Sequence, residues 1–405
     1  MLIFKIVSRN ILRQKRRSFL TFLLMTSGFV FLSLSIGIAD GSFLNLIKLF
    51  TQNYTGHIQI HKKGYLENPC FYNTINSADK IEDKISCIKD VKASTPRSRF
   101  TALAFAGKKT TGVRVIGIDP EKEANVTTCK LKVTQGNYIA NVPDKNIIIS
   151  YNLAKVLNVK IRDQIVLIGQ GADGSVANDI FIVSGILNDK SAGFGQMICY
   201  MHIKTAQEFA SLYGRIHEIA VVLSDISKTK NTVLRIKKAI NDSSYEVSPW
   251  QEIEKEFYKS MQADEKGRNL SFIIFMIVVA AGILDTVLMT ILERTREFGL
   301  IRAIGARSSQ VFKLIIYETL LITSASVTAG AVIGFTGNYI IMKYGISLSE
   351  PVFFAGVYLD RLVGTISPET LLIPAVFTFT TSLIVSVPPA FRAALLLPFE
   401  AMHKP

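Results

Sequence analysis

The chain has 405 residues, enough for two or three folded units, and hydrophobic residues make up 49% of it. Charged residues make up only 19%, and the mean hydropathy of +0.31 is high for a soluble enzyme. The net charge of +14 could indicate nucleic-acid binding, but residues 1–17 hold six basic side chains directly before an apolar stretch. Basic residues in that position mark the cytoplasmic side of a membrane segment. We therefore expect membrane lipid, and no nucleic acid, among the partners.

Residues 1–17 predict a cytoplasmic amphipathic helix. On a helical wheel Phe4, Val7 and Ile11 fall within about 60° of one another, and the basic side chains lie opposite them. Such a helix can lie in the membrane interface. The alternative is a plain basic anchor with no fixed helix.

Four long apolar stretches predict transmembrane helices. In chain order they occupy residues 18–42, 270–292, 311–342 and 370–392. A cleaved signal peptide is an alternative for the first stretch, but its apolar run is longer than the roughly 7–15 residues of a signal peptide.

Short loops set the orientation, because basic residues collect on the cytoplasmic side. The residues after the second span carry several basic side chains, whereas the loop at 343–369 mixes basic and acidic ones. The segment at 293–310, the tail at 393–405 and both termini should therefore be cytoplasmic. The domain at 43–269 and the short loop at 343–369 should be periplasmic.

Residues 43–269 alternate strand-like and helix-like patterns, which predicts a mixed α+β domain. The expected strands are 111–118, followed by a turn at Asp119 and Pro120, then 146–150, 163–168, 179–185 and 217–223. The expected helices are 152–157 and 228–240. The predicted fold class is a membrane protein with four transmembrane α-helices and a large α+β extracytoplasmic domain between the first and second helix.

The sequence predicts no catalytic, cofactor-binding or metal site. It contains no Walker A, HExxH or GxSxG motif, and the glycine-rich residues 169–174 are best interpreted as a hairpin loop. His57 and His61 lack an evident third ligand, so we interpret them as surface residues of a strand-like segment.

The four cysteines form no CxxC pair, which makes a zinc site improbable. They are Cys70, Cys87, Cys129 and Cys199. In a periplasmic domain they could form a disulfide, and small buried thiols are the alternative.

Two carboxylates, Asp285 and Glu318, fall within predicted spans, where a charge is costly unless it faces a partner or water. Asp285 could belong to a translocation path or to a helix–helix contact, and both interpretations stay open. Ser326, Gly330 and Gly334 recur every four residues on the third span, a spacing that lets two helices approach closely.

The segment at 293–306, ERTREFGLIRAIGA, closely resembles the cytoplasmic signature of an ABC permease superfamily. That superfamily includes the lipoprotein-releasing permeases of the LolC/LolE type, MacB and FtsX. Residues 117–120, 147–168 and 389–401 are similar to further blocks of the same family, so the resemblance covers nearly the whole chain. Two positions depart from it, because Arg162 stands where the family has glycine and Asp285 where it has asparagine.

Phe298, Ile301 and Ile304 recur every three residues and predict a short helix with one apolar face. Glu297 and Arg302 could pair with a partner at its rim, and Gly299 and Gly305 allow a close backbone approach or a helix end. The resemblance implies that this is the coupling helix that docks on a nucleotide-binding subunit. The coupling residues it implies are Glu293, Glu297, Phe298, Gly299, Arg302, Ala303 and Gly305. The alternative is an ordinary juxtamembrane linker.

The resemblance also implies a function: a non-catalytic permease of the bacterial inner membrane, driven by an ABC ATPase dimer on separate chains. The ATPase would bind ATP and Mg, and a second permease copy or paralogue would complete the complex. The favoured role is release of lipoprotein cargo to a periplasmic carrier by a mechanical stroke of the periplasmic domain. The alternatives are MacB-like efflux and FtsX-like mechanotransmission that regulates a periplasmic partner.

Overall fold

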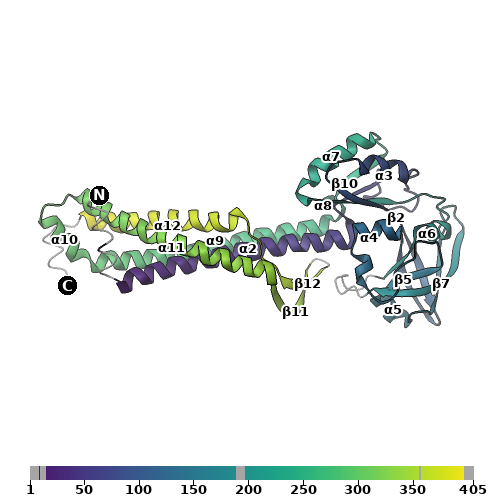
Figure 1. Ribbon diagram of the computed structural model, residues 1–405, viewed down its shortest axis with the longest axis horizontal. Coiled ribbons are helices and arrows are strands. Elements are labelled where there is room, and N and C mark those ends of the chain that lie inside the picture. The colour runs from purple at the N-terminus through teal and green to yellow at the C-terminus, as the bar shows by residue number, and fades with distance from the viewer. Residues whose placement is uncertain (1–8, 10–14, 188–196, 355–356, 396–405) are drawn as a thin grey trace. The chain divides into compact units, whose positions relative to one another are not determined.

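The computed structural model describes residues 9, 15–187, 197–354 and 357–395, and its elements are labelled in Figure 1. The chain divides into two compact units with separate cores. The helical unit comprises Met1–Asn45, Ala263–Ser349 and Asp360–Pro405, and the β-rich unit comprises Leu46–Gln262 and Glu350–Leu359. The amphipathic helix predicted at 1–17 and the tail predicted at 393–405 lie almost entirely outside the described residues.

Among the described residues, four helices are long and apolar enough to cross a membrane, as the sequence predicts. They are α2 (Lys15–Phe50), α9 (Lys255–Glu293), α11 (Ser308–Tyr344) and α12 (Pro368–Leu395). α2 continues past residue 42, and α9 begins well before residue 270. Hydropathy locates the apolar part of a helix, whereas the helix continues as long as its backbone hydrogen bonds do. Between α11 and α12 the chain forms a two-stranded sheet of β11 (Ile346–Phe354) and β12 (Val357–Leu362).

Small residues on α11 lie directly against α2. A Cβ atom added to Gly330 would lie 2.7 Å from the ring of Phe29, and one added to Gly334 would lie 2.8 Å from the hydroxyl of Ser33. Ser326 donates a hydrogen bond from its hydroxyl to a backbone carbonyl of α2 at 3.2 Å. The four-residue spacing on α11 therefore lies at a close helix–helix contact within one chain.

The β-rich unit begins and ends with an antiparallel sheet in the order β10-β1-β9-β2. These strands are β10 (Tyr245–Pro249), β1 (Ile58–Lys62), β9 (Glu218–Leu223) and β2 (Val91–Ala106). The helices α3 (Ala78–Ser86) and α7 (Thr229–Ile240) pack Ile81, Ile85 and Ile236 against the sheet. The order of strands and helices is that of a ferredoxin-like fold with a long insertion between β2 and β9.

The insertion closes into a ring of six strands, in which each strand pairs with the next and β6 pairs back with β2. After β2 the ring contains β3 (Lys109–Ile118), β8 (Ile198–His202), β5 (Asn146–Ser150), β7 (Val176–Leu187) and β6 (Gln164–Gln170). Every strand of the ring contributes to one buried cluster that includes Phe100, Phe181 and Met201. Two helices, α5 (Tyr151–Leu157) and α6 (Ile203–Phe209), add to this core, and β4 (Val133–Gly136) pairs with β7. The predicted mixed α+β domain is confirmed.

Two predicted turns have different outcomes. The glycine-rich stretch lies at the hairpin between β6 and β7, as predicted, although Gly169 and Gln170 still pair with β7 and the loop begins at Gly171. Gly171 donates its N–H to the Ser175 carbonyl at 2.8 Å. Asp119 and Pro120 instead begin a helix, α4 (Pro120–Val126). The Asp119 carboxylate accepts the N–H groups of Glu121 and Lys122 at 3.2 and 3.1 Å, as expected for an N-cap followed by proline.

None of the four cysteines, all of which lie among the described residues, forms a disulfide, so the predicted alternative of a disulfide is wrong. Cys129 and Cys199 are buried, as expected for small apolar side chains, and burial raises the pKa of the Cys199 thiol. Cys70 is half-buried and Cys87 is exposed.

Arg162 occupies a left-handed backbone conformation with φ of +73°. Only glycine adopts this conformation without steric cost, which explains why the resemblance places glycine at this position. The N–H of Arg162 donates to the Val183 carbonyl at 2.8 Å, so the turn before β6 keeps its shape despite the arginine.

Replacing Arg162 with glycine should raise the free energy of unfolding of the β-rich unit by about 1 kcal/mol, because the backbone strain disappears. Urea unfolding of the full chain in detergent, followed by the fluorescence of Trp250, the chain's single tryptophan, measures the change. Gly174→Ala is the matched control: its φ is +86° and its Cβ would meet open space, so it should destabilise the unit by a similar amount. Unfolding curves of R162G that coincide with the wild type would contradict the strain.

Candidate functional site: the segment between α9 and α11

The segment after α9 folds into a short helix, α10 (Thr295–Ala303). Arg294 stands at its N-cap position, directly after the last residue of α9. Gly305 ends it with φ of +106°, a conformation that requires glycine, and the Ala306 N–H then donates to the Ile301 carbonyl at 3.2 Å. The chain re-enters a helix at Ser308, so α10 is bounded by a sharp turn on each side.

One side of α10 is buried in the helical unit. Phe298 is 1% exposed and belongs to a cluster with Val311 and Ile315 of α11 and Ala390 of α12. Gly299 beside it is also buried, which allows the helix to pack closely. These contacts hold α10 against two membrane helices.

A buried arginine ties the same side of α10 to α11. The Nη1 atom of Arg294 lies 2.7 Å from both carboxylate oxygens of Glu318, and its Nε atom lies 3.0 Å from Oε2 of Glu297. The guanidinium carbon lies 5.1 Å from the ring centre of Phe298, within cation–π distance. Arg294 is only 4% exposed, so its charge depends on these partners.

Away from the buried Phe298, α10 presents apolar side chains to the surroundings. Leu300 and Ile301 are exposed, and Ile304, next to the helix end, is 80% exposed. The predicted single apolar face of Phe298, Ile301 and Ile304 is therefore divided. A step of three residues turns a helix by about 300°, so Phe298 and Ile304 point about 120° apart, one inward and one outward.

The structure joins only some of the predicted site residues. Glu297, Phe298 and Glu318 meet through Arg294, and Glu297 is thus already paired within the chain instead of being free for a partner. Asp285 is exposed on α9, and among the described residues it has no polar partner. Glu293, Ala303 and Gly305 are exposed, and Arg302 is half-buried.

Arg294 is one of the basic residues that predict a cytoplasmic segment, and its structural role does not follow from that pattern. A signal for that role exists in the sequence. A carboxylate within an apolar span is costly unless it faces a partner or water, and Glu318 lies about three helical turns into α11. Arg294, at the adjoining end of α9, can supply that partner.

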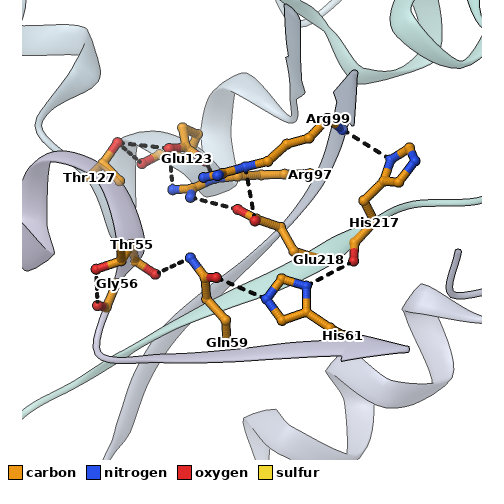
Figure 2. A network of polar contacts seen from close by, with 10 residues as sticks. All are labelled: Thr55, Gly56, Gln59, His61, Arg97, Arg99, Glu123, Thr127, His217 and Glu218. Carbon is orange, nitrogen blue, oxygen red and sulfur yellow. Dashed lines mark hydrogen bonds and ion pairs between the residues drawn. The ribbon is translucent and has the colours of Figure 1, made fainter. Parts of the chain in front are cut away.

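A second buried polar cluster, the Arg97 cluster, lies in the β-rich unit (Figure 2). Arg97 of β2 binds Glu123 of α4 at 2.7 Å and Glu218 of β9 at 3.0 Å, and Arg99 binds Glu218 at 2.9 Å. The Thr127 hydroxyl donates to Glu123 at 2.8 Å. Burial acts to lower the pKa of Arg97, but the two carboxylates outweigh it and raise that pKa above its ordinary value.

The prediction that His57 and His61 are surface residues is wrong. β1 lies between β10 and β9, so both of its edges are paired. The consecutive residues 58–61 are all buried, so both faces of the strand are covered, and His61 is almost completely buried. His61 contacts the His217 carbonyl at 3.2 Å and Gln59 Oε1 at 2.9 Å, whereas His57 Nδ1 accepts the Leu223 N–H at 2.9 Å. Burial lowers the pKa of both histidines, that of His57 to about 4. Among the described residues no cluster of His, Cys, Asp or Glu could hold a metal ion.

Comparison with known families matches two regions of the chain. Residues 18–239 match the MacB-like periplasmic core domain, and residues 269–396 match the FtsX-like permease C-terminal domain. The first match alone covers more than half of the chain. The chain belongs to the MacB/FtsX-like permease superfamily. The β-rich unit is therefore an α/β periplasmic domain, and the protein is a multi-pass protein of the bacterial inner membrane.

Several curated proteins are similar to this family member. It is 25% identical over 245 residues to the macrolide export ATP-binding/permease protein MacB of Nitrobacter winogradskyi, covering 58% of this chain and 35% of that protein. It is 21% identical over 341 residues to the lipoprotein-releasing system transmembrane protein LolE of Haemophilus influenzae, covering 81% of each chain. The chain thus spans about a third of the length of that MacB relative.

Among solved structures, the periplasmic region of MacB from Actinobacillus actinomycetemcomitans is similar at 14% identity and a TM-score of 0.37. The match covers 52% of this chain and 97% of that one. Within this permease, the Arg97 cluster lies in the MacB-like periplasmic core domain and the pair of Arg294 and Glu318 lies in the FtsX-like domain.

Glu123→Gln should destabilise the periplasmic domain by about 3 kcal/mol, because Arg97 loses one of two carboxylates in a buried site. Hydrogen exchange of the full chain, read by mass spectrometry in β2 and β9, should then show protection about 100-fold lower. Asp179→Asn is the matched control, since it neutralises the partner of Lys145 in an exposed ion pair that contributes about 0–1 kcal/mol. Equal protection in the two variants would show that the Arg97 cluster does not stabilise the fold.

Proposed function

We propose that this chain is the permease subunit of an ABC transporter and that a separate ATPase dimer docks on the exposed side of α10. The observation that carries the proposal is the two-sided character of this helix. Phe298 anchors it in the helical unit, while Leu300, Ile301 and Ile304 are exposed beside one another in sequence. Exposed apolar side chains gathered on one short helix are typical of a protein contact.

Charge supports placing α10 in the cytoplasm. Arg296, Arg302 and Arg307 lie in or next to the helix, and basic residues in short loops collect on the cytoplasmic side. Both chain ends would then also be cytoplasmic. The 405 residues contain no Walker A sequence, so in this proposal ATP and Mg are bound by the partner.

For the cargo we favour lipoproteins, released from the inner membrane to a periplasmic carrier. The alignment with LolE covers 81% of both chains, whereas the chain spans only 35% of the MacB relative. The chain passes from the helical to the β-rich unit at residues 45–46 and 262–263, which lie inside α2 and α9. Continuous helical backbone at both positions suits a mechanical stroke. A second permease copy or paralogue would complete the complex, and MacB-like efflux and FtsX-like regulation of a periplasmic partner are the alternatives.

Ile304→Glu should abolish docking without disturbing the fold, because the side chain is exposed and a charge there opposes an apolar contact. We expect the ATPase that copurifies with the wild-type chain to be lost at least tenfold from the variant. Leu131→Glu, an equally exposed apolar residue of the periplasmic domain, is the control and should copurify normally. Undiminished ATPase in the Ile304→Glu preparation would remove the docking assignment.

The same variant tests the cargo in cells. If the cargo is lipoprotein, cells that carry only Ile304→Glu should retain palmitate-labelled lipoproteins in the inner membrane, and spheroplasts should release them several-fold more slowly to added periplasmic extract. Normal release combined with increased macrolide sensitivity would favour efflux. Normal release combined with altered cell-wall hydrolysis would favour the regulatory function.

A further inference from the structure

We propose that Arg294 is a positioning residue that fixes α10 on α11, so that a displacement of the docking segment is passed directly to α11 through Glu318. The inference rests on the proposed function for its consequence, but the contact itself can be tested on this chain alone. Nothing in the family resemblance assigns a role to Arg294 or to its pairing with Glu318.

Arg294 stands where three helices meet. Arg294 follows the last residue of α9, occupies the N-cap of α10 and binds the carboxylate of Glu318 on α11. One side chain thus joins three helices at a single point. Its guanidinium contacts both oxygens of Glu318 and also covers the ring of Phe298, so α10 cannot rotate about its axis without moving Glu318 or breaking the pair.

Both members of the ion pair are buried. The side chains of Arg294 and Glu318 are 4% and 10% exposed, and the surrounding side chains include Met25, Ile291 and Ile315. Separating the two charges there would leave each uncompensated in an apolar setting, whereas moving them together keeps the pair intact. The two helices therefore respond to force as one body at this point.

A small cavity beside the pair supplies polar neighbours on its other side. It has a volume of about 30 Å³ and is lined by Ser18 and Thr21 of α2, Thr319 of α11 and the pair itself. That volume can hold one or two water molecules with several polar partners. The remaining donors of the guanidinium can thus be satisfied without a further protein side chain.

The two carboxylates that Arg294 contacts differ in their exposure. Glu318 is buried, but the side chain of Glu297 is 50% exposed, where water and salt weaken an ion pair. Glu318 should therefore provide most of the interaction that fixes α10 on α11, and Glu297 should contribute little to it. The same guanidinium provides its own matched control, because either carboxylate can be neutralised while the other stays.

The test measures the distance between spin labels at Arg296→Cys on α10 and Lys313→Cys on α11, both exposed positions. The full chain is used in lipid nanodiscs, with Cys70 and Cys87 replaced by serine because the other two cysteines are buried. The wild type and Glu297→Gln should give one narrow distance distribution. Glu318→Gln should at least double its width, and the exchanged pair Arg294→Glu with Glu318→Arg should restore it.

A distribution in Glu318→Gln as narrow as the wild type would overturn the inference, whether or not an ATPase docks. If circular dichroism and gel filtration show that Glu318→Gln does not fold, the same distance measurement on Arg294→Lys tests the inference instead. Lysine keeps the charge but cannot contact both carboxylates in the same way, so intermediate broadening is expected and an unchanged width overturns the inference.

The consequence is measured with the copurified ATPase. Glu318→Gln should still bind the ATPase, because the exposed side of α10 is intact, but the permease-dependent stimulation of ATP hydrolysis should fall at least fivefold. The exchanged pair should recover most of it, which a merely structural defect at α11 would not do. Stimulation that stays normal, or binding that is lost together with stimulation, would overturn the relay. A complete absence of ATPase from wild-type preparations would instead refute the proposed function and leave the label distances standing.

Discussion

The ion pair between Arg294 and Glu318 is the constraint on which the end of the helical unit depends. A buried carboxylate inside an apolar helix is costly without a partner, and the guanidinium of Arg294 supplies one for Glu318 at the point where α9 ends and the chain turns into α10. That turn starts α10 with Phe298 facing inward. Phe298 and Ile304 point about 120° apart, and with Phe298 buried, Ile304 is 80% exposed.

Other buried polar side chains of the helical unit also form hydrogen bonds between helices. Thr323 of α11 donates its hydroxyl to Ser382 of α12 at 3.0 Å, and Asn338 of α11 donates its amide to Ser33 of α2 at 3.2 Å. The glycines at 330 and 334 bring α11 close enough to α2 for such contacts. Lipid offers helices no hydrophobic driving force for association, so close packing and these hydrogen bonds must hold the helices together.

Features that depend on local sequence patterns could be predicted, whereas features that depend on pairing between distant segments could not. Apolar runs located the four membrane helices, and β5 follows the run of β-branched residues at 146–150. His61 was misjudged because burial depends on which strands flank β1, and those strands lie more than 150 residues away in sequence. Arg294 was missed for the same reason, since a positive-inside count treats every basic residue alike. The closure of the six-strand ring by β6 on β2 had no local signal at all.

The two buried arginines, Arg97 and Arg294, differ in how strongly their carboxylate partners are held. Arg97 sits between Glu123 and Glu218, both almost fully buried, and Glu218 is bound a second time by Arg99. Displacing any of these four side chains would leave a buried charge without a partner, so we expect the Arg97 cluster to stay rigid while its domain moves. Arg294 also contacts two carboxylates, but the side chain of Glu297 is half exposed, so breaking its ion pair with Arg294 costs little free energy. In the proposed relay, the ion pair of Glu297 with Arg294 would break when a partner docks, whereas the ion pair of Arg294 with Glu318 would stay intact and pass the displacement of α10 to α11.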